Sequence, residues 1–424
     1  MSSVVPDGWQ LKTVGELSDV RRGASPRPIK DPKWWGGNVG WVRISDVTSS
    51  SKYLKKTTQY LSDEGVSKSV KINRGEVVLS ICATIGRPII IDVDACVHDG
   101  FVWFSRLAEF IDREYWYYFL SSKEEFLASQ RQSGTQGNLN TSIVSDLLCL
   151  LPPHPEQKKI AAILSSVDEV IEKTQAQIDK LKALKTGMMQ ELLTRGVGVD
   201  GKPHTEFKDS PIGRIPKGWS VAKLSEIIGS MEGGVSVNGE NRSKTHQEIG
   251  VLKVSSVFKG RFIPEEHKAV VKEDELRARV NPVEGKILFS RANTPDLVGE
   301  SGYVESSISD LFLPDKLWMI SAKNESKTNM RWLSYVLSSG RTRKLISDAA
   351  TGTSGSMKNI SKPNLLSIEV AVPCPSEQFE IAKVIRAIDV RIEKRSQQLI
   401  QKRAIKKALM QDLLTGKVRV KVDS

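Results

Sequence analysis

The sequence predicts an α+β protein in which two mixed α/β globular domains are separated by two long helices that form an antiparallel coiled coil, as a pseudo-two-fold internal repeat. Three observations predict this fold. A chain of 424 residues is long enough for two or three domains, its second half repeats its first, and each half closes with apolar residues at helical spacing. The expected segments are a first globular domain at 1–151, a first helix at 152–195, a linker at 196–215, a second globular domain at 216–372, a second helix at 373–419 and a tail at 420–424.

The repeat is visible in several short matches and one long one. Pro6-Asp7-Gly8-Trp9 recurs as Pro216-Lys217-Gly218-Trp219. The long match joins 152–194 to 373–415 without a gap, and it aligns Glu156-Gln157 with Glu377-Gln378. Each half is therefore a variable block followed by a near-constant block.

The constant blocks predict long helices. Apolar residues recur at alternating steps of four and three from Ile160 to Leu192, and again from Ile381 to Leu413, where polar residues interrupt the stripe. Each helix begins after a proline-rich stop and would be about 60 Å long. Two helices with single apolar stripes bury them most simply against each other, and the globular block between them suits an antiparallel pair. Packing of each helix on its own globular domain is the alternative.

The variable blocks predict mixed α/β domains. In the first block, β-type runs at 39–44, 76–81, 88–93 and 97–104 alternate with turn residues, and one helix is expected at 113–132. The aromatic run 115–119 points all round that helix, which favours core packing over base stacking.

Composition restricts the classes of function. The net charge of +12, from 62 basic and 50 acidic residues, favours a polyanionic partner. No apolar run is long enough to span a bilayer, and the N-terminus lacks a secretory pattern, so we expect a cytoplasmic protein. Cys82, Cys96, Cys149 and Cys374 stand among apolar neighbours without metal-ligand spacing, which predicts small buried hydrophobes.

Sequence motifs for catalysis or metal binding are absent. There is no HExxH, GxSxG or clustered His/Asp/Glu set. We therefore expect no catalytic and no metal-ligating residues in this chain, and a binding module is the simplest interpretation.

On these motifs the chain resembles the specificity subunits of type I restriction-modification enzymes. Both divergent halves close with a proline-rich stop, Glu-Gln-x-x-Ile-Ala, a long heptad helix and Met-Gln-(Glu/Asp)-Leu-Leu-Thr, so the resemblance covers essentially the whole chain. It implies two target-recognition domains, two spacer helices and double-stranded DNA as the ligand. It also implies assembly with two methyltransferase (modification) subunits and two motor-nuclease (restriction) subunits, with S-adenosylmethionine, ATP and Mg²⁺ used by the holoenzyme and not bound by this chain.

An antiparallel helix pair would relate the two domains by an approximate two-fold axis, so that each meets one half-site. Since the domains differ in sequence, the half-sites should differ, and the helices should set a fixed gap between them. The second helix is the more basic, with eleven basic and five acidic residues over 377–419. Its lysines Lys402, Lys406 and Lys407 are interpreted as facing DNA phosphates or, alternatively, an acidic partner subunit.

Candidate DNA-binding residues are polar and basic side chains on loops and strand ends, because Arg and Lys read guanine, Asn and Gln read adenine, and Ser and Thr hold phosphates. In the first domain they are Arg21, Arg22, Arg27, Lys30, Arg43, Ser45, Arg131, Gln132, Thr135, Gln136, Asn138 and Asn140. In the second they are Arg242, Lys244, Lys253, Ser255, Arg291, Asn293, Arg341, Arg343, Lys344, Thr353, Lys358 and Asn359.

Two other classes of function remain open at this point. A coiled-coil scaffold with duplicated heads would bind proteins and show no affinity for DNA. A fused methyltransferase or nuclease would need catalytic motifs that the sequence does not display. Neighbouring genes for a methyltransferase and an ATP-driven nuclease would favour the specificity subunit over both.

Overall fold

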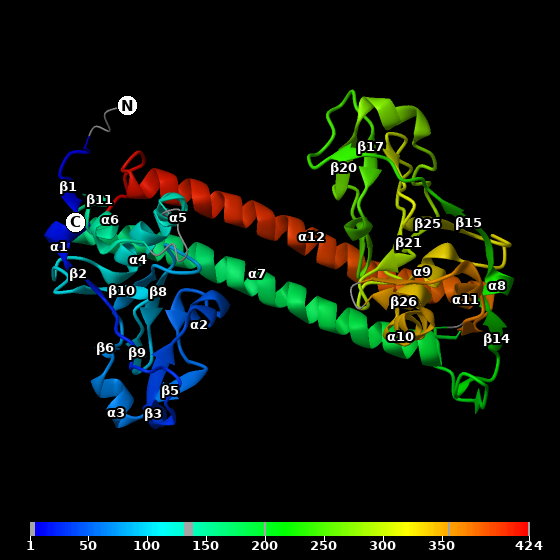
Figure 1. The fold of residues 1–424 in the computed structure, drawn as a ribbon, viewed down its shortest axis with the longest axis horizontal. Coiled ribbons are helices and arrows are strands. Elements are labelled where there is room, and N and C mark those ends of the chain that lie inside the picture. The colour runs from blue at the N-terminus through cyan, green and yellow to red at the C-terminus, as the bar shows by residue number, and fades with distance from the viewer. Residues whose placement is uncertain (1–4, 131–138, 199–200, 355–356, 423–424) are drawn as a thin grey trace. The chain divides into compact units, whose positions relative to one another are not determined.

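The computed structural model describes residues 5–130, 139–198, 201–354 and 357–422, and the chain divides into two compact units (Figure 1). Unit 1 consists of residues 1–176 and 396–424, and unit 2 consists of residues 177–395. We call the globular part of unit 1, up to residue 151, head 1, and the globular part of unit 2, from residue 216 to 372, head 2. Each unit also contains a stretch of both long helices.

Head 1 is built on two sheets. A five-stranded sheet has the order β2-β10-β7-β8-β4, a four-stranded sheet has the order β5-β3-β9-β6, and β1 pairs with β11. The strands are β1 Gln10–Thr13, β2 Asp19–Arg22, β3 Trp35–Val42, β4 Tyr53–Leu54, β5 Gln59–Leu61, β6 Val70–Ile72, β7 Val77–Ser80, β8 Pro88–Ile91, β9 Ala95–Val97, β10 Phe101–Ser105 and β11 Leu148–Leu151. The helices are α1 Val14–Leu17, α2 Ile44–Ser49, α3 Asp63–Ser67, α4 Arg113–Ser122, α5 Glu124–Ser129, α6 Thr141–Ser145 and the short 3₁₀ turn η1 Pro32–Trp34.

The apolar residues of head 1 form a core that continues into the long helices. Strands β7 and β8 are buried along their whole length, as β-branched runs covered on both faces should be. The buried aromatic side chains of α4 pack in the same cluster as Ile160 and Leu164 of the first long helix and Leu413 of the second. Core packing of the aromatic run is thus confirmed, and head and helices are held by one hydrophobic cluster.

Head 2 repeats this framework with more strands. Its sheets have the orders β15-β25-β21-β23-β19-β18, β16-β20-β17-β24 and β22-β27-β26, and β14 pairs with β28 as β1 does with β11. The strands are β14 Ser220–Lys223, β15 Ile228–Gly233, β16 Gly239–Glu240, β17 Gly250–Leu252, β18 Val257–Phe258, β19 Gly260–Phe262, β20 His267–Val270, β21 Ile287–Ser290, β22 Ala292–Asn293, β23 Ser301–Tyr303, β24 Leu311–Phe312, β25 Leu317–Ala322, β26 Thr351–Ser354, β27 Met357–Asn359 and β28 Glu369–Val372. The helices are α8 Leu224–Ile227, α9 Met330–Ser338, α10 Gly340–Ala349, α11 Lys362–Leu366 and the 3₁₀ turns η2 Val254–Ser256 and η3 Lys272–Arg277.

The register of the central strands shows that the repeat is structural. In head 1, Phe101 of β10 lies opposite Ser80 of β7. In head 2, Leu317 of β25 lies opposite Ser290 of β21. The same antiparallel pair therefore occupies the middle of both heads.

The long helices α7 (His154–Arg195) and α12 (Pro375–Leu414) form an antiparallel coiled coil. Within unit 1, Lys406 of α12 contacts Asp168 of α7, and within unit 2, Lys185 of α7 contacts Asp389 of α12. Because higher numbers on one helix meet lower numbers on the other, the helices run in opposite directions. The first helix ends where Gly196 adopts a left-handed φ of +70°, the usual closing conformation of a helix.

Four expectations need correction. The helix expected at 113–132 is two helices, α4 and α5, which break at Lys123, and its last two residues lie outside the described ones. The run 97–104 is not one strand, because a turn at 98–100 separates β9 from β10 and sends them into different sheets. The second long helix ends at Leu414, before the expected 419. Cys374 is exposed, whereas Cys96 and Cys149 are buried.

The segment after the first long helix is more than a simple linker. Strands β12 (Phe207–Lys208) and β13 (Ile215–Pro216) form a small antiparallel ladder there.

Among the helices in the described ranges, none has the length and apolar character needed to cross a membrane.

Candidate nucleic-acid interface

Three separate segments of head 1 surround an open cleft of about 420 Å³. They are the loop after β2, the junction between β3 and α2, and the turn between β9 and β10. The lining residues are Ser25, Arg27, Ile29, Trp41, Arg43, Ile44, Ser45, His98 and Asp99. Arg27, Arg43 and Ser45 are thereby brought together, although they are distributed over two sequence segments.

The turn between β9 and β10 forms one wall of the cleft. The His98 ring packs against two aromatic rings, Trp41 at 5.8 Å and Phe101 at 4.8 Å between ring centroids. The backbone N–H of Gly100 donates to Nδ1 of His98 at 2.8 Å. Burial lowers the pKa of His98, with Asp99 acting in the opposite direction, so the imidazole is neutral at physiological pH.

Asp99 fixes the loop that follows β2. Its carboxylate accepts hydrogen bonds from the Ser25 hydroxyl at 2.6 Å and from the Arg27 guanidinium at 2.9 Å. Burial of Asp99 acts to raise its pKa, but the hydrogen bond from Ser25 and the charge of Arg27 outweigh it and hold the pKa below its ordinary value. The carboxylate is therefore ionised and can accept further hydrogen bonds at the cleft.

Arg43 and Ser45 line the cleft from the junction between β3 and α2. Buried Asp46 accepts a hydrogen bond from the backbone N–H of Arg43 at 3.0 Å and one from the Thr58 hydroxyl at 2.9 Å. These bonds hold the backbone at the start of α2, while the side chains of Arg43 and Ser45 remain exposed. A guanidinium, a hydroxyl and a carboxylate around one cleft supply both donors and acceptors for base edges.

The remaining candidates of head 1 are more scattered. Arg21 pairs with Asp19 at 3.2 Å, Arg22 and Lys30 are exposed, and the side chain of Asn140 accepts from the backbone N–H of Ser142 at the start of α6. Five candidates lie outside the described residues: Arg131, Gln132, Thr135, Gln136 and Asn138.

Head 2 carries Lys253 and Ser255 where head 1 carries Arg43 and Ser45. Lys253 follows β17 and precedes η2, as Arg43 follows β3 and precedes α2. Here Glu266 accepts a hydrogen bond from Ser255 at 2.7 Å and lies 4.0 Å from the Lys253 ammonium. The corresponding positions thus have similar backbone settings but different side-chain surroundings.

Two basic candidates near this position already have acidic partners. Lys244 lies 2.5 Å from Asp310. Arg242 pairs with Glu240 and with Glu248, each at 2.6 Å, and its hydrogen bonds lower the pKa of Glu248 to about 2. DNA phosphates would have to compete with these carboxylates.

The three-stranded sheet of head 2 holds a further group. Arg291 donates to the Asp315 carbonyl at 2.8 Å, Lys358 donates to the Ser347 carbonyl at 3.2 Å, and Asn293 donates to the Ser290 hydroxyl at 3.4 Å. Asn359 is exposed, and the side chain of Thr353 lies outside the described atoms.

The candidates on α10 divide into exposed and engaged residues. Lys344 is exposed, and Arg341 donates to the Ile212 carbonyl. Arg343 is turned inward, where it lies 3.3 Å from Glu300 and donates to the Asp296 carbonyl at 3.0 Å. This placement argues against base reading by Arg343, since its guanidinium binds the head itself.

The lysines of the second long helix also differ from the expectation. Lys402 donates to the Thr174 hydroxyl at 2.8 Å, and Lys406 pairs with Asp168. Both therefore face α7, and the interpretation that they face DNA phosphates is wrong. Lys407 is exposed and pairs with Glu125 at 2.7 Å.

Sequence reasoning missed Ser25, Trp41, His98 and Asp99. The Asp99-Gly100 pair is a turn signal, but the apolar residues on both sides of it led to the prediction of a continuous strand.

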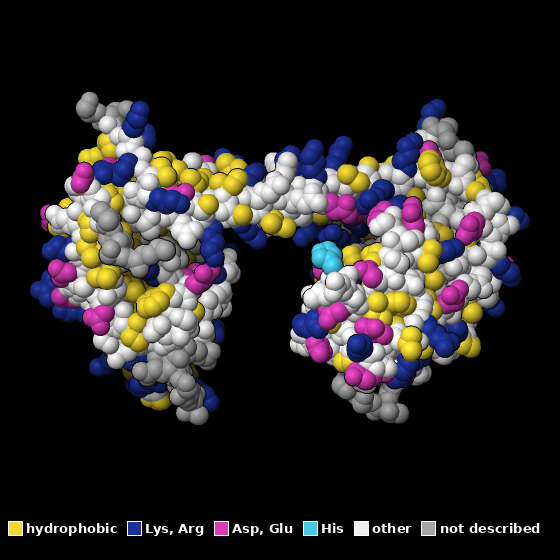
Figure 2. Space-filling model, turned by 90° about the horizontal axis from the view of Figure 1, so that it is seen from above, with side chains coloured by type: hydrophobic (Ala, Val, Ile, Leu, Met, Phe, Trp, Pro, Cys, Tyr) yellow, Lys and Arg dark blue, Asp and Glu magenta, His cyan; other side chains and the backbone are white. Residues whose placement is uncertain are grey.

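On the face shown in Figure 2, lysine and arginine side chains of both units are interspersed with aspartate and glutamate. Charge alone consequently does not outline the interface. In the described part of the chain, no group of three or more His, Cys, Asp or Glu side chains is placed to hold a metal ion.

A repeated Glu-Gln pair fastens each head to the helix that follows it. Gln157 donates to the Pro152 carbonyl at 3.0 Å and accepts from the Asp112 backbone at 2.8 Å. In unit 2, Gln378 donates to the Pro373 carbonyl at 3.0 Å and accepts from the Asn329 backbone at 2.8 Å. The motif that marks the sequence repeat is thus a structural joint.

The preceding glutamate is buried in both units but has different partners. Glu156 accepts from Trp9 at 3.3 Å and from Arg419. Glu377 accepts from Trp219 at 2.8 Å and from the backbone N–H groups of Val197 and Gly198, each at 3.0 Å. In each unit, the segment that follows a long helix therefore supplies hydrogen-bond donors to a buried carboxylate: Arg419 after α12 for Glu156, and Val197 and Gly198 after α7 for Glu377.

Known proteins of one family match both halves of the chain. A family model described as the type I restriction modification DNA specificity domain matches residues 6–183 and 216–402. The specificity subunit of the type I restriction enzyme MjaVIII from Methanocaldococcus jannaschii is 28% identical, over 98% of this chain and 94% of that protein. The EcoKI specificity subunit from Escherichia coli K12 is 23% identical, over 91% of this chain and 82% of that protein. The crystal structure of a type I restriction-modification S subunit from M. genitalium is similar in fold, with a TM-score of 0.57 at 14% identity, over 96% of each chain.

Proposed function

Because this chain belongs to the type I restriction-modification DNA specificity family, we propose that it reads a split, asymmetric DNA target, with one half-site on each head. The chain is the non-catalytic DNA-recognition subunit of such an enzyme. The observation that carries the proposal is a common backbone framework with different side chains at one position. Arg43 and Ser45 share a cleft with His98 and Asp99 in head 1, whereas Lys253 and Ser255 of head 2 lie beside Glu266.

The readers of the first half-site are proposed to be Arg43 and Ser45, with Asp99 as an acceptor and Arg27 held against it. Arginine in the major groove favours guanine, and an aspartate accepts from the exocyclic amine of cytosine. The head 1 half-site is therefore expected to contain at least one G·C pair. Lys253 and Ser255 are proposed as the counterparts in head 2, and the exposed Lys30, Lys344 and Asn359 as backbone or base contacts.

The coiled coil is proposed to set the gap between the half-sites. Two observations support this role: the helices pair in opposite directions within each unit, and each helix shares the hydrophobic cluster of a head. The corresponding domain assignment is target-recognition domains at 1–151 and 216–372 and spacer segments at 152–195 and 373–419, within which the helices are α7 and α12.

The chain works with DNA and with other restriction-modification subunits. We propose two methyltransferase and two motor-nuclease subunits per complex, which use S-adenosylmethionine, ATP and Mg²⁺. Methylation and cleavage then take place on these partners, in the cytoplasm, at the site that this chain selects.

The test is to map modified adenines in host DNA with and without this gene. The proposal expects modification at two different short sequences separated by a constant number of unspecified bases, and its loss when the gene is deleted. A contiguous or palindromic motif would overturn the asymmetric split target. Unchanged methylation after deletion, with purified complex showing no preference among DNA sequences, would favour a scaffold.

A further inference from the structure

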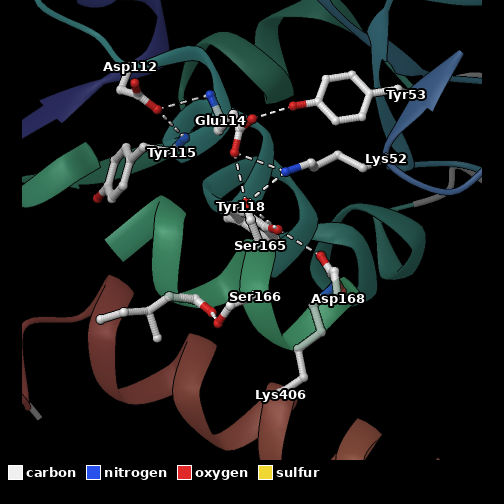
Figure 3. A network of polar contacts seen from close by, with 11 residues as sticks. Lys52, Tyr53, Asp112, Glu114, Tyr115, Tyr118, Ser165, Ser166, Asp168 and Lys406 are labelled. Atoms are coloured by element: carbon white, nitrogen blue, oxygen red, sulfur yellow. Dashed lines mark hydrogen bonds and ion pairs between the residues drawn. The ribbon is translucent and has the colours of Figure 1, made fainter. Parts of the chain in front are cut away.

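The coiled-coil interface contains lysines at positions where heptad helices normally place apolar residues, and two of them, Lys406 and Lys185, pair with an aspartate of the other helix. Lys406 lies 2.6 Å from Asp168, and the two side chains are only 23% and 18% exposed. The hydroxyl of Tyr118 donates to the same carboxylate at 2.7 Å, and the Lys406 ammonium lies 5.4 Å from the Tyr118 ring centre. Figure 3 shows how α4 of the head, α7 and α12 meet at these three residues.

Unit 2 repeats this arrangement with the helices exchanged. Lys185 of α7 lies 2.7 Å from Asp389 of α12, and both side chains are 15% exposed. The Tyr335 hydroxyl donates to Asp389 at 2.9 Å, and the Lys185 ammonium lies 5.4 Å from the Tyr335 ring centre. In both units a head supplies the tyrosine, the helix that follows that head supplies the aspartate, and the antiparallel helix supplies the lysine.

A largely buried lysine is tolerated only when its charge is compensated. Removing one partner of such a pair leaves an uncompensated charge in a poorly solvated place, which is more costly than never burying the pair. A polar residue at an interface position of a coiled coil consequently selects the register that satisfies it.

The spacing of the four charges is compatible with one register. Asp168 and Lys185 are seventeen residues apart on α7, and Asp389 and Lys406 are seventeen residues apart on α12. A slip of seven residues would keep the apolar stripes in contact but would separate all four charges from their partners. In one direction, the slip would place Lys406 opposite Ala161, Asp168 opposite Leu399, Lys185 opposite Ala382 and Asp389 opposite Ile178. In the other direction, it would place them opposite Gln175, Leu413, Ser396 and Leu192, in the same order.

We propose that the triads Tyr118–Asp168–Lys406 and Tyr335–Asp389–Lys185 are positioning elements that fix the register of the helices and the seating of each head upon them. This inference rests on the proposed function, because the register matters through the gap between half-sites. Each head is seated by a lysine that belongs to the other repeat. Neither half of the chain alone contains a complete triad.

The surroundings of the triads differ in charge. In unit 1, Glu114 lies 2.9 Å from Lys52 and accepts from the Ser165 hydroxyl at 2.7 Å (Figure 3). In unit 2, Glu305 takes the acidic role, at 2.7 Å from Arg331 and 3.3 Å from Arg386. The Tyr-Asp-Lys geometry is kept although its neighbours change, which supports a role specific to the triad.

The experiment compares gap accuracy in complete complexes carrying Lys406→Met, Lys185→Met or both substitutions. Methionine keeps most of the side-chain volume and removes the charge. The measured quantity is a ratio. Its numerator is methylation at sites whose gap is one to three base pairs longer or shorter than the correct gap, and its denominator is methylation at sites with the correct gap. The proposal expects the double variant to raise this ratio at least about tenfold, with both half-sequences still required. An unchanged ratio, with activity merely lower at every site, would overturn it.

Matched variants separate register from stability. Lys173→Met removes a lysine of α7 that is 74% exposed and pairs only locally, with Glu169, and it should leave the ratio unchanged. Lys406→Arg keeps the positive charge, so its ratio should stay close to that of the wild-type complex and below that of Lys406→Met. If the methionine variants do not form a complex, Tyr118→Phe with Tyr335→Phe removes only the two hydroxyl donors and should raise the ratio in the same direction. An unchanged ratio in that double variant would also overturn the proposal.

A second measurement keeps the two proposals distinguishable. If wild-type complex methylates a contiguous target, the proposed function fails, and register is then read from disulfide formation between cysteines introduced at Thr174 and Lys402, which lie in contact across the helices. The register proposal expects Lys185→Met to lower the yield of this cross-link several-fold. An equal yield would overturn it independently of DNA.

Discussion

The indole N–H of Trp219 donates to the carboxylate of Glu377 at 2.8 Å, and that side chain is only 2% exposed. Trp219→Phe would remove one donor from a buried charge and should destabilise the protein by about 1 to 3 kcal/mol. Urea unfolding measures this change. Trp9→Phe is the matched control, because the Trp9 bond to Glu156 is longer, at 3.3 Å, and a smaller loss is expected. A loss for Trp9→Phe that equals or exceeds that for Trp219→Phe would contradict this ranking.

Arg43 and Lys253 occupy corresponding positions in the two heads, and their replacement should affect different half-sites. Arg43→Ala should weaken binding by about 1 to 3 kcal/mol and relax the first half-sequence alone, while Lys253→Ala should relax the second alone. Methylome sequencing of each variant reads this directly. If either substitution lowers binding equally for all sequences, the side chain holds a phosphate and does not read a base.

His98 should make stability depend on pH. Burial lowers its pKa in the folded protein, so below the ordinary value of about 6.5 the unfolded chain binds a proton that the folded chain does not. Stability should therefore fall by up to about 1.4 kcal/mol between pH 7.5 and 5.5 through this residue. Urea unfolding of His98→Asn at the two pH values should show a correspondingly smaller fall. Identical pH dependence in both proteins would show that His98 titrates normally.

The cysteines should differ in reactivity with thiol reagents. Cys374 is exposed, whereas burial raises the pKa of Cys149 to about 12 and also raises the pKa values of Cys82 and Cys96. At pH 8.5 the native protein should show one fast-reacting thiol, and unfolding should release the others. Cys374→Ser should abolish the fast phase. A fast phase that survives this substitution would place reactivity elsewhere.

The length of the coiled coil should set the gap. Seven residues inserted into both helices, between 176 and 177 and between 395 and 396, preserve the heptad phase and fall at the boundary between the units. Two turns of helix add about 10 Å, which corresponds to about three base pairs of DNA. The methylated motif should keep both half-sequences and gain this spacing. An active variant with the original gap would remove the helices from this role.

The sequence predicts the long helices better than the cleft. A regular apolar period is a local property, so it is enough to place α7 and α12, whereas the Glu156-Gln157 repeat shows only that the two halves correspond and does not reveal the contacts that join head and helix. The turn at His98 is not predicted because the apolar residues on both sides of it have the pattern of one strand. The contacts of its Asp99 are made with Ser25 and Arg27, which are more than seventy residues away along the chain.

The lysines of the helices illustrate a second limit. Charge count placed Lys402 and Lys406 on an outer surface, because a basic residue is exposed by default. Their actual partners, Thr174 and Asp168, come from the antiparallel helix. No local pattern identifies such a partner, since it depends on the register of two segments that are far apart in sequence. Arg343 is a similar case, because its position on the sequence suggests an exposed DNA contact, whereas in the structure it lies 3.3 Å from Glu300 of the same head.

The charged neighbours of the two triads bear on how new specificities arise in evolution. Lys52 and Glu114 both belong to head 1, and Glu305 and Arg331 both belong to head 2, so each ion pair would travel with its head during gene recombination. On the helix side the corresponding residue is Ser165 in one repeat and Arg386 in the other. We therefore expect that transfer of a head between the two positions in the chain would require adaptation mainly at this one helix position.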